Sequence, residues 1–274
     1  LTAPPTEPIR RNILRRQQDI VSRLIDMQNA ALSPREHSAD LANIRDDITA
    51  IWQTEEHPTE ARTVAAEHEH VLFFLTDCIY RVIPVVYETV EAALEAVWGE
   101  DGRTTELPVM VRMASWIGGD MVGRSEITAR SIRDTLARQR SLVLGLYHRE
   151  CRELAEKMSQ GTTRVGVSAA LEERLRLYSG HFPNALGLTP LRHREMRYRV
   201  FMRLVMARLQ STATEGLFPF DSADEFAADL QLITNSLEAN RGQHAGLFGV
   251  RRLLRRVATF GFHFMTLDVR QEAL

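Results

Sequence analysis

The residues best suited to chemistry are Asp268 and Arg270, near the end of the stretch Val257–Gln271. From Gly261 onward the side chains alternate with the two-residue period of a strand, so we expect a strand over 261–270. One predicted face carries His263, Met265, Leu267 and Val269, and the other carries Phe264, Thr266, Asp268 and Arg270. Buried charges are costly, so this pair favours a strand whose carboxyl end opens onto an anion site. A surface ion pair on an edge strand explains the same pattern.

A glycine-rich loop is a second candidate for anion binding, and it contains Gly118, Gly119, Asp120 and Gly123. Glycine backbones can direct N–H groups at a phosphate. The loop lacks the Gly-Lys-Ser/Thr ending of a P-loop, and Asp120 would repel a phosphate. Taken alone, the loop is better explained as a tight turn before a helix.

Potential metal ligands are scattered along the chain: His57, His68, His70, His148 and Cys151. They form neither an HExxH motif nor a paired-cysteine motif. On a helix, His68 and His70 would point about 200° apart and could not share one ion. We therefore expect no metal site among these residues, and we interpret Cys78 and Cys151 as packed thiols.

Four arginines, Arg251, Arg252, Arg255 and Arg256, flank a leucine pair on a predicted helix. A nucleic-acid surface needs aromatic platforms beside its basic groups, and none occur here. The formal net charge of −2 also argues against nucleic-acid binding. We expect these arginines to form a solvated helix face or to pair with carboxylates of the fold.

The composition is that of an ordinary soluble globular protein, with 274 residues, 44% hydrophobic and 26% charged. We find no apolar run near the roughly 20 residues that cross a membrane, and no signal-peptide pattern. The cysteines show no redox spacing, which favours a reducing compartment. We therefore expect a cytoplasmic protein with no membrane segment. Because the chain opens without an initiator methionine or a lead-in, we also expect it to be part of something longer.

The elements that must position these residues are mostly helices. Apolar residues at helical spacing cover roughly two thirds of the chain, whereas about one third of the residues of a typical globular protein are helical. We expect a short helix capped by Asp40 and a long helix over 64–98, kinked at Pro84. Thr128 is the expected cap of a helix that ends near Met158. The last predicted helix covers 250–257. Few strands are expected.

Two further helix starts have recognisable signals. Thr189-Pro190 places a cap before a proline at the first helical position, and this predicts a helix to about Gln210. Ser222 and Glu225 have the spacing of a capping box. A linker is predicted over 181–188, immediately before the first of these two helices.

Four motifs together resemble the phosphoenolpyruvate carboxylase family. Residues 2–11, TAPPTEPIRR, resemble its TAHPTE..RR opening, and residues 52–56, WQTEE, resemble its WQTDE segment. Residues 115–125, SWIGGDMVGRS, resemble its SWxGGDxDGNP loop. Residues 259–271, TFGFHFMTLDVRQ, resemble its TFGxHxxxLDIRQ strand. The order and rough spacing match over nearly the whole chain, which covers the middle of the N-terminal half of a family member.

The resemblance implies a mostly α fold in which a large helical insertion interrupts an incomplete α/β (TIM-type) barrel. Residues 1–3 and 261–270 would be barrel strands, and residues 8–257 the helical region between them. The whole chain, 1–274, would then be a single partial domain. Arg270 would lie at the carboxyl end of a barrel strand, where such barrels place their chemistry.

The resemblance also implies an activity. The family converts phosphoenolpyruvate and bicarbonate to oxaloacetate and phosphate with magnesium or manganese. By resemblance, Arg270 binds phosphoenolpyruvate, while Arg10 and Arg11 correspond to a pair that contacts a sugar-phosphate activator in some members. The family's metal carboxylates and its other phosphate-binding motifs would lie beyond Leu274.

Departures from the family pattern affect both motifs that carry chemistry. Pro4 stands at the position of the family's catalytic histidine and has no titratable group. Val122, Arg124 and Ser125 replace an aspartate, an asparagine and a proline of the glycine loop. We therefore expect a truncated or inactive segment that self-associates or needs a complementing polypeptide. The alternative is a non-enzymatic helical interaction module that retains the scaffold.

Overall fold

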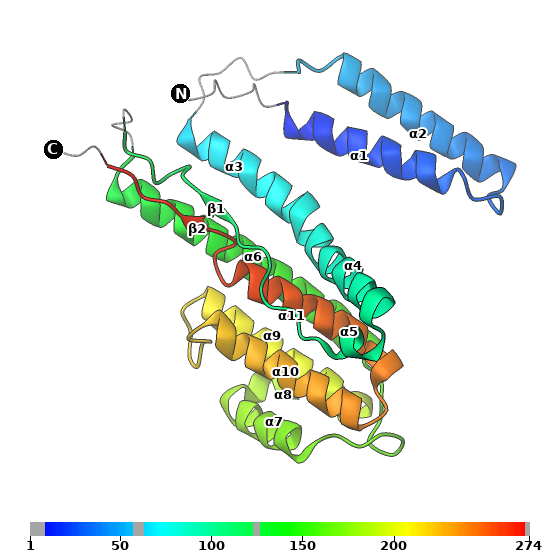
Figure 1. The fold of residues 1–274 in the computed structure, drawn as a ribbon, viewed down its shortest axis with the longest axis vertical. Helices are drawn as coiled ribbons and strands as arrows, with labels where there is room; N and C mark the ends of the chain where they lie inside the picture. Colours follow the sequence, from blue (N-terminus) through cyan, green and yellow to red (C-terminus); the bar gives the residue numbers. More distant parts are fainter. Residues whose placement is uncertain (1–8, 57–62, 123–126, 272–274) are drawn as a thin grey trace. The chain divides into compact units, whose positions relative to one another are not determined.

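The computed structural model describes residues 9–56, 63–122 and 127–271, and these residues are predominantly helical, as expected (Figure 1). The chain divides into two compact units, Leu1–Phe73 and Phe74–Leu274, and each is considered by itself. The strand predicted over 1–3, together with Pro4 and Gly123, lies outside the described residues.

The first unit contains a helical hairpin of α1, Arg11–Asp26, and α2, Pro34–Trp52 (Figure 1). Two ion pairs join its helices, Arg16 to Asp47 at 2.6 Å and Arg23 to Asp40 at 3.4 Å. The prediction that Asp40 caps a short helix was wrong, because α2 begins two turns earlier. Ser33 is the N-cap and forms a capping box with Glu36, while Pro34 supplies the fixed φ of the first turn.

The predicted helix over 64–98 is present in three parts. These are α3, Val64–Phe74, the π-helical turn η1, Leu75–Ile79, and α4, Tyr80–Trp98. The irregular turn ends before Pro84, which lies inside α4. By length and composition alone, Val64–Trp98 is apolar enough to cross a membrane, and 39% of its apolar stretch is buried. This differs from the sequence analysis, which found no apolar run near the length of a membrane span. Core helices of soluble proteins meet the same criteria of length and composition.

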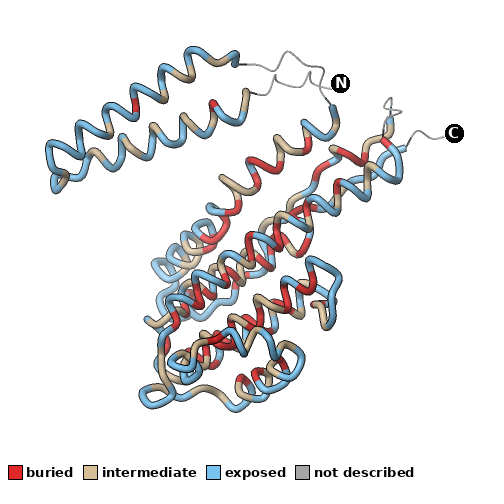
Figure 2. Tube along the Cα trace, turned by 180° about the vertical axis from the view of Figure 1, so that it is seen from behind, coloured by how far each residue is buried: buried red, intermediate tan, exposed pale blue. Residues whose placement is uncertain are grey.

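The second unit is organised around α6, Ala129–Lys157, which packs against α9, Arg197–Ala213, and α11, Phe248–Phe260. The remaining helical elements are α5, Glu100–Thr104; α7, Ala169–His181; α8, Pro183–Gly187; η2, Leu191–His193; α10, Ala223–Ala239; and η3, Gln243–Leu247. Buried residues, red in Figure 2, recur along the longer helices of this unit. The core includes Val143, Tyr147, Phe226, Leu230 and Leu253, each at 0% exposure.

The helix starts predicted at Thr128 and Ser222 are confirmed, and the start predicted at Thr189-Pro190 needs correction. Thr128 caps α6 as expected. Ser222 accepts the Glu225 amide, but the Glu225 carboxylate bonds the Asp221 amide instead of completing a capping box. The helix predicted after Pro190 begins only at Arg197, because the residues after the proline form η2.

The linker predicted over 181–188 contains α8, a helix that begins with Pro183 at its first turn. The four arginines of α11 pair with carboxylates, which confirms one of the two interpretations of that helix. The pairs are Arg251–Glu238, Arg252–Glu88, Arg255–Glu91 and Arg256–Glu150, at 2.7 or 2.8 Å.

A short parallel sheet joins β1, Ala114–Ser115, to β2, Thr266–Leu267, with Ala114 opposite Thr266. The strand predicted over 261–270 is therefore much shorter than expected. Its first part is a turn, with positive φ at Gly261 and Phe264.

Burial explains why this turn replaces the first part of the predicted strand. Phe264 is fully buried against the rings of Tyr80 and Phe260, whereas His263, on the predicted apolar face, is exposed. Asp268 and Arg270 are also exposed, so the predicted buried charges are absent. Packing of the aromatic ring has overridden the alternating pattern.

Candidate functional site

The end of β2 and the glycine loop form one structural feature, because their backbones are hydrogen-bonded to each other. The Arg270 amide donates to the carbonyl oxygen of Gly119 at 3.0 Å, and the Met121 amide donates to the carbonyl oxygen of Arg270 at 3.0 Å. Upstream, the Asp268 amide bonds Ser115 at 2.9 Å. Two segments that are far apart in sequence are thereby held in register.

Side-chain contacts at Arg270 differ from those expected. Its guanidinium carbon lies 5.4 Å from the ring centroid of Trp116, a cation–π arrangement. Among the described residues, no carboxylate lies within salt-bridge distance of this guanidinium. The predicted Asp268–Arg270 ion pair is therefore wrong. Trp116 holds the arginine without neutralising it, and the planar fork of donors remains suited to a phosphate or carboxylate.

The glycine loop is a tight turn, as predicted from its sequence alone. The Gly119 and Asp120 amides both donate to the carbonyl oxygen of Trp116 at 3.0 Å. Gly118 has φ +87°, and a Cβ there would clash with Thr135. The Asp120 carboxylate accepts the Val122 amide at 3.2 Å, so it braces its own loop. The loop therefore positions Arg270 through its backbone.

Arg10 and Arg11 lie in the first unit at the start of α1, and each has an acidic neighbour. Arg10 is 3.7 Å from Glu55, and Arg11 is 3.4 Å from Glu69. The Nε of Arg10 is buried without a hydrogen-bond partner. An anion that binds this pair must therefore compete with two carboxylates.

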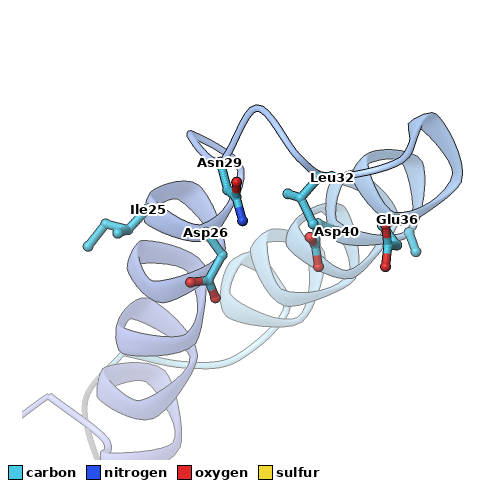
Figure 3. A pocket seen from close by; sticks show the side chains of 7 residues that line it. Ile25, Asp26, Asn29, Leu32, Glu36 and Asp40 are labelled. Atoms are coloured by element: carbon cyan, nitrogen blue, oxygen red, sulfur yellow. The ribbon is translucent and has the colours of Figure 1, made fainter.

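A solvent-open hollow of about 530 Å³ lies at the turn between α1 and α2 (Figure 3). Its lining includes the carboxylates Asp26, Glu36 and Asp40. Glu36 is engaged by Ser33 at the start of α2, and Asp40 by Arg23. These two carboxylates serve the hairpin itself, so we assign no ligand to the hollow.

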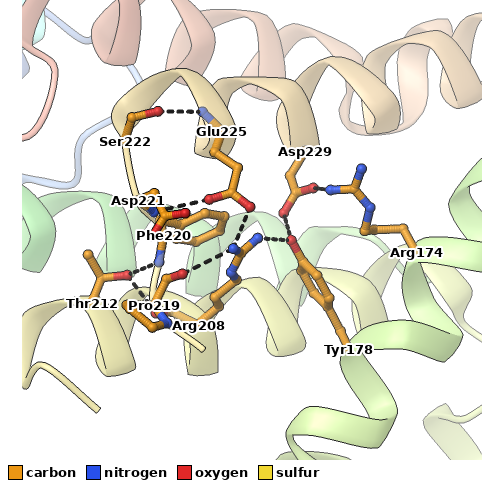
Figure 4. Close-up of polar contacts among 10 residues, drawn as sticks. All are labelled: Arg174, Tyr178, Arg208, Thr212, Pro219, Phe220, Asp221, Ser222, Glu225 and Asp229. Atoms are coloured by element: carbon orange, nitrogen blue, oxygen red, sulfur yellow. Dashed lines mark hydrogen bonds and ion pairs between the residues drawn. The ribbon is translucent and has the colours of Figure 1, made fainter. Parts of the chain in front are cut away.

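The most buried ionic groups occupy a different place, between α7, α9 and α10 (Figure 4). Arg208 and Asp229 are 2% and 0% exposed. The hydroxyl of Tyr178 links them, since it accepts from Arg208 and donates to Asp229. Arg174 and Glu225 complete the cluster. Burial raises the pKa of Asp229 to about 6, against the opposing effects of Tyr178 and the arginines.

The sequence analysis missed this cluster, although a signal was present. Asp229 lies at helical spacing among the apolar residues Phe226, Leu230 and Ile233, on the buried face of α10. A lone carboxylate on an apolar face implies a buried cationic partner. The sequence alone did not identify that partner, Arg208.

Comparison with known proteins agrees with the resemblance seen in the sequence motifs. The family described as phosphoenolpyruvate carboxylase matches residues 1–274. The chain belongs to the phosphoenolpyruvate carboxylase family. The phosphoenolpyruvate carboxylase of Xanthomonas euvesicatoria pv. vesicatoria (strain 85-10) is 44% identical over 272 residues, which are 99% of this chain and 30% of that protein.

Further relatives agree in name and in coverage. The phosphoenolpyruvate carboxylase of Xanthomonas campestris pv. campestris (strain 8004) is 45% identical over 99% of this chain and 30% of its own length. The phosphoenolpyruvate carboxylase of Ralstonia nicotianae is 34% identical over 99% of this chain and 28% of its own length. The chain thus spans less than a third of the length of the curated relatives it matches.

The divalent cation used by the phosphoenolpyruvate carboxylase family does not fit the residues described. Within 9–56, 63–122 and 127–271, no three His, Cys, Asp or Glu side chains are grouped so that they could hold a metal ion. Of the candidate ligands considered from sequence, Cys151 is fully buried and His57 lies outside the described residues. We derive no step through a metal from this chain.

Proposed function

We propose that this chain supplies part of the phosphoenolpyruvate-binding face of a cytoplasmic phosphoenolpyruvate carboxylase, and that by itself it does not form oxaloacetate. In this proposal, Arg270 binds the phosphate or carboxylate of phosphoenolpyruvate. The observation that carries it is the backbone ladder that fixes Arg270 beside the glycine loop. Family membership supports the identity of the substrate.

The chemistry assigned to the chain's own residues is binding and orientation. Arg270 presents several N–H donors in one plane, which matches two oxygens of a phosphate or carboxylate. Trp116 limits the directions in which the guanidinium can point. β1 and β2 would be parts of an α/β barrel, with Arg270 at the carboxyl end of a strand, where such barrels carry out catalysis.

Two considerations support the absence of turnover by the chain alone. Pro4 replaces the histidine expected from the family pattern, and proline cannot transfer a proton. The described residues also include no group fitted to the divalent cation. We expect purified chain with phosphoenolpyruvate, bicarbonate and magnesium to form no oxaloacetate, measured by coupled reduction with malate dehydrogenase. Substrate-dependent turnover would contradict this part of the proposal.

Arg10 and Arg11 remain candidates for a sugar-phosphate contact. Their carboxylate neighbours predict weak binding in this chain, because a ligand must displace Glu55 and Glu69. Whether a ligand uses them can be tested by comparing titrations of wild type and Arg11→Gln with glucose 6-phosphate.

The binding proposal is tested by NMR titration of the 274-residue chain with phosphoenolpyruvate. We expect saturable shifts around Trp116 and Gly119, with an affinity on the order of millimolar or weaker for one exposed arginine. Arg270→Ala should abolish the shifts, and Arg270→Lys should weaken them because the planar fork is lost.

Arg112→Ala is the matched control for that titration. Arg112 is an exposed arginine just before β1, so its removal makes the same change in net charge near the same sheet. We expect binding by this variant to be unchanged. Identical shifts in wild type and Arg270→Ala would remove Arg270 from the site.

A second candidate function, a helical interaction module, is favoured by exposed apolar side chains on the α1–α2 hairpin. Val21, Leu24 and Ile25 are each at least half exposed, and Trp52 is 85% exposed. Exposed apolar patches often mark association surfaces. We therefore also propose that the chain self-associates or binds a complementing polypeptide.

A further inference from the structure

A cavity of about 590 Å³ lies in the second unit between α6, α8 and α9. Its lining combines basic and apolar side chains, among them His148, Arg152, Leu188, His193, Arg199 and Arg203. All of these residues belong to the second unit, and none of them is part of the feature that holds Arg270. The proposed function does not use them.

One of these arginines is fixed by the backbone. The Nε of Arg199 donates to the carbonyl oxygens of Ala155 at 2.7 Å and Met158 at 3.2 Å, and its Nη2 donates to that of Glu156 at 2.6 Å. These carbonyls belong to the end of α6, where the helix dipole favours a cation. Arg199 therefore contributes a positive charge at a defined place on the cavity wall.

The other two arginines lack counter-charges. Among the described residues, neither Arg152 nor Arg203 has a carboxylate within salt-bridge distance. The one acidic side chain of the described lining is Glu156, against Arg152, Arg199 and Arg203. The lining thus carries an excess of positive charge, which favours an anion.

His193 provides an independent indication of a missing partner. Its Nε2 accepts a hydrogen bond from Nε of Arg192 at 3.3 Å, so in the neutral ring the proton lies on Nδ1. The Nδ1 atom is buried and has no hydrogen-bond partner. Buried donors are nearly always paired, so an acceptor is expected there. Loss of hydration, followed by repulsion from Arg199, Arg192 and Arg203, lowers the pKa of His193.

The remainder of the cavity lining is apolar. It includes Leu188, which is 82% exposed, and Met206. We propose that this cavity binds a small organic anion, with its phosphate or carboxylate on Arg152, Arg199 and Arg203 and its apolar part against Leu188 and Met206. This assignment is independent of the proposed phosphoenolpyruvate site.

The experiment titrates the 274-residue chain with phenyl phosphate, inorganic phosphate and benzyl alcohol, and follows the ring resonances of His148 and His193 by NMR. Both phosphates should shift these resonances saturably. Phenyl phosphate should bind about tenfold more tightly than inorganic phosphate because it also buries a ring. Benzyl alcohol, which lacks the charge, should give no saturable shift.

Four variants separate the contributions to binding. Arg203→Gln and Arg152→Gln should each weaken both phosphates by about tenfold, through loss of one charge-assisted contact. Arg133→Gln, an exposed arginine on the same helix as Arg152, should leave binding unchanged. Leu188→Ser should weaken phenyl phosphate and leave inorganic phosphate unchanged.

Several results would overturn the assignment. These are no saturable shift at tens of millimolar phosphate, equal losses in Arg133→Gln and Arg152→Gln, or equal shifts with benzyl alcohol. Arg152 is exposed, so its variant remains informative even where Arg203→Gln perturbs folding. Arg270→Ala should leave the His148 and His193 shifts intact, which separates this site from the proposed phosphoenolpyruvate contact.

Discussion

Replacing Arg208 by methionine should destabilise the second unit strongly, because this guanidinium is buried and makes contacts in several directions. It donates to the Tyr178 hydroxyl, to the Glu225 carboxylate and, at 3.0 Å, to the carbonyl oxygen of Pro219 (Figure 4). Its carbon also lies 4.3 and 4.1 Å from the ring centroids of Phe218 and Phe220. Methionine fills similar space but can donate to none of these groups.

The magnitude follows from what each group loses. The part-buried carbonyl oxygen of Pro219 loses its donor, which costs about 1–3 kcal/mol. Glu225 is partly exposed and regains water, so its lost ion pair is worth about 1 kcal/mol or less. Three aromatic rings, those of Tyr178, Phe218 and Phe220, lose a cation, and the methionine sulfur returns part of that loss. We expect a total near the lower end of the about 3–5 kcal/mol typical of a broken buried pair.

Equilibrium urea denaturation followed by circular dichroism measures this loss of free energy of unfolding. Hydrogen exchange in α7, α9 and α10 localises the change to the second unit. Arg251→Met is the matched control, because Arg251 pairs with Glu238 at the surface. The control should cost about 1 kcal/mol or less. Equal losses in the two variants would refute the conclusion that the buried cluster stabilises the fold.

Further predictions concern Asp229, Gly119 and the state of association. The pKa of Asp229 is about 6 in the folded state and about 4 in the unfolded state, so between these pH values the folded state binds more protons. As pH falls from 7 to 4, the free energy of unfolding of wild type should therefore rise by about 2–3 kcal/mol relative to that of Asp229→Asn. Parallel urea titrations check this, and a constant difference would contradict it. A Cβ at Gly119 would clash with the carbonyl oxygen of Asp268, so Gly119→Ala should cost about 1–3 kcal/mol and displace β2. Gly145→Ala, in open space on α6, should instead stabilise by about 0.5–1 kcal/mol in the same denaturation assay. The chain should also be larger than a monomer by light scattering and bind a hydrophobic dye, because the hairpin exposes Trp52 and its apolar neighbours. A strictly monomeric species that binds no dye would count against that expectation.

Local rules determined much of the helical architecture. The Thr128 cap and the apolar stripe after it predicted α6, because capping and helical periodicity involve residues within a few turns of each other. The family followed from four motifs at their expected spacing, and the comparisons confirmed it. The tight turn at Gly118 was also predictable, since glycine tolerates positive φ.

Only the tertiary structure decided which distant residues meet. Periodicity extended β2 back to Gly261, whereas burial of Phe264 against Tyr80 and Phe260 turns the chain there. The sequence suggested Asp268 as the partner of Arg270, but the register of β1 and β2 places Trp116 against it. The physical reason is that the burial and the charge pairing of a side chain depend on all its neighbours in space. The spacing of residues along the chain does not specify those neighbours.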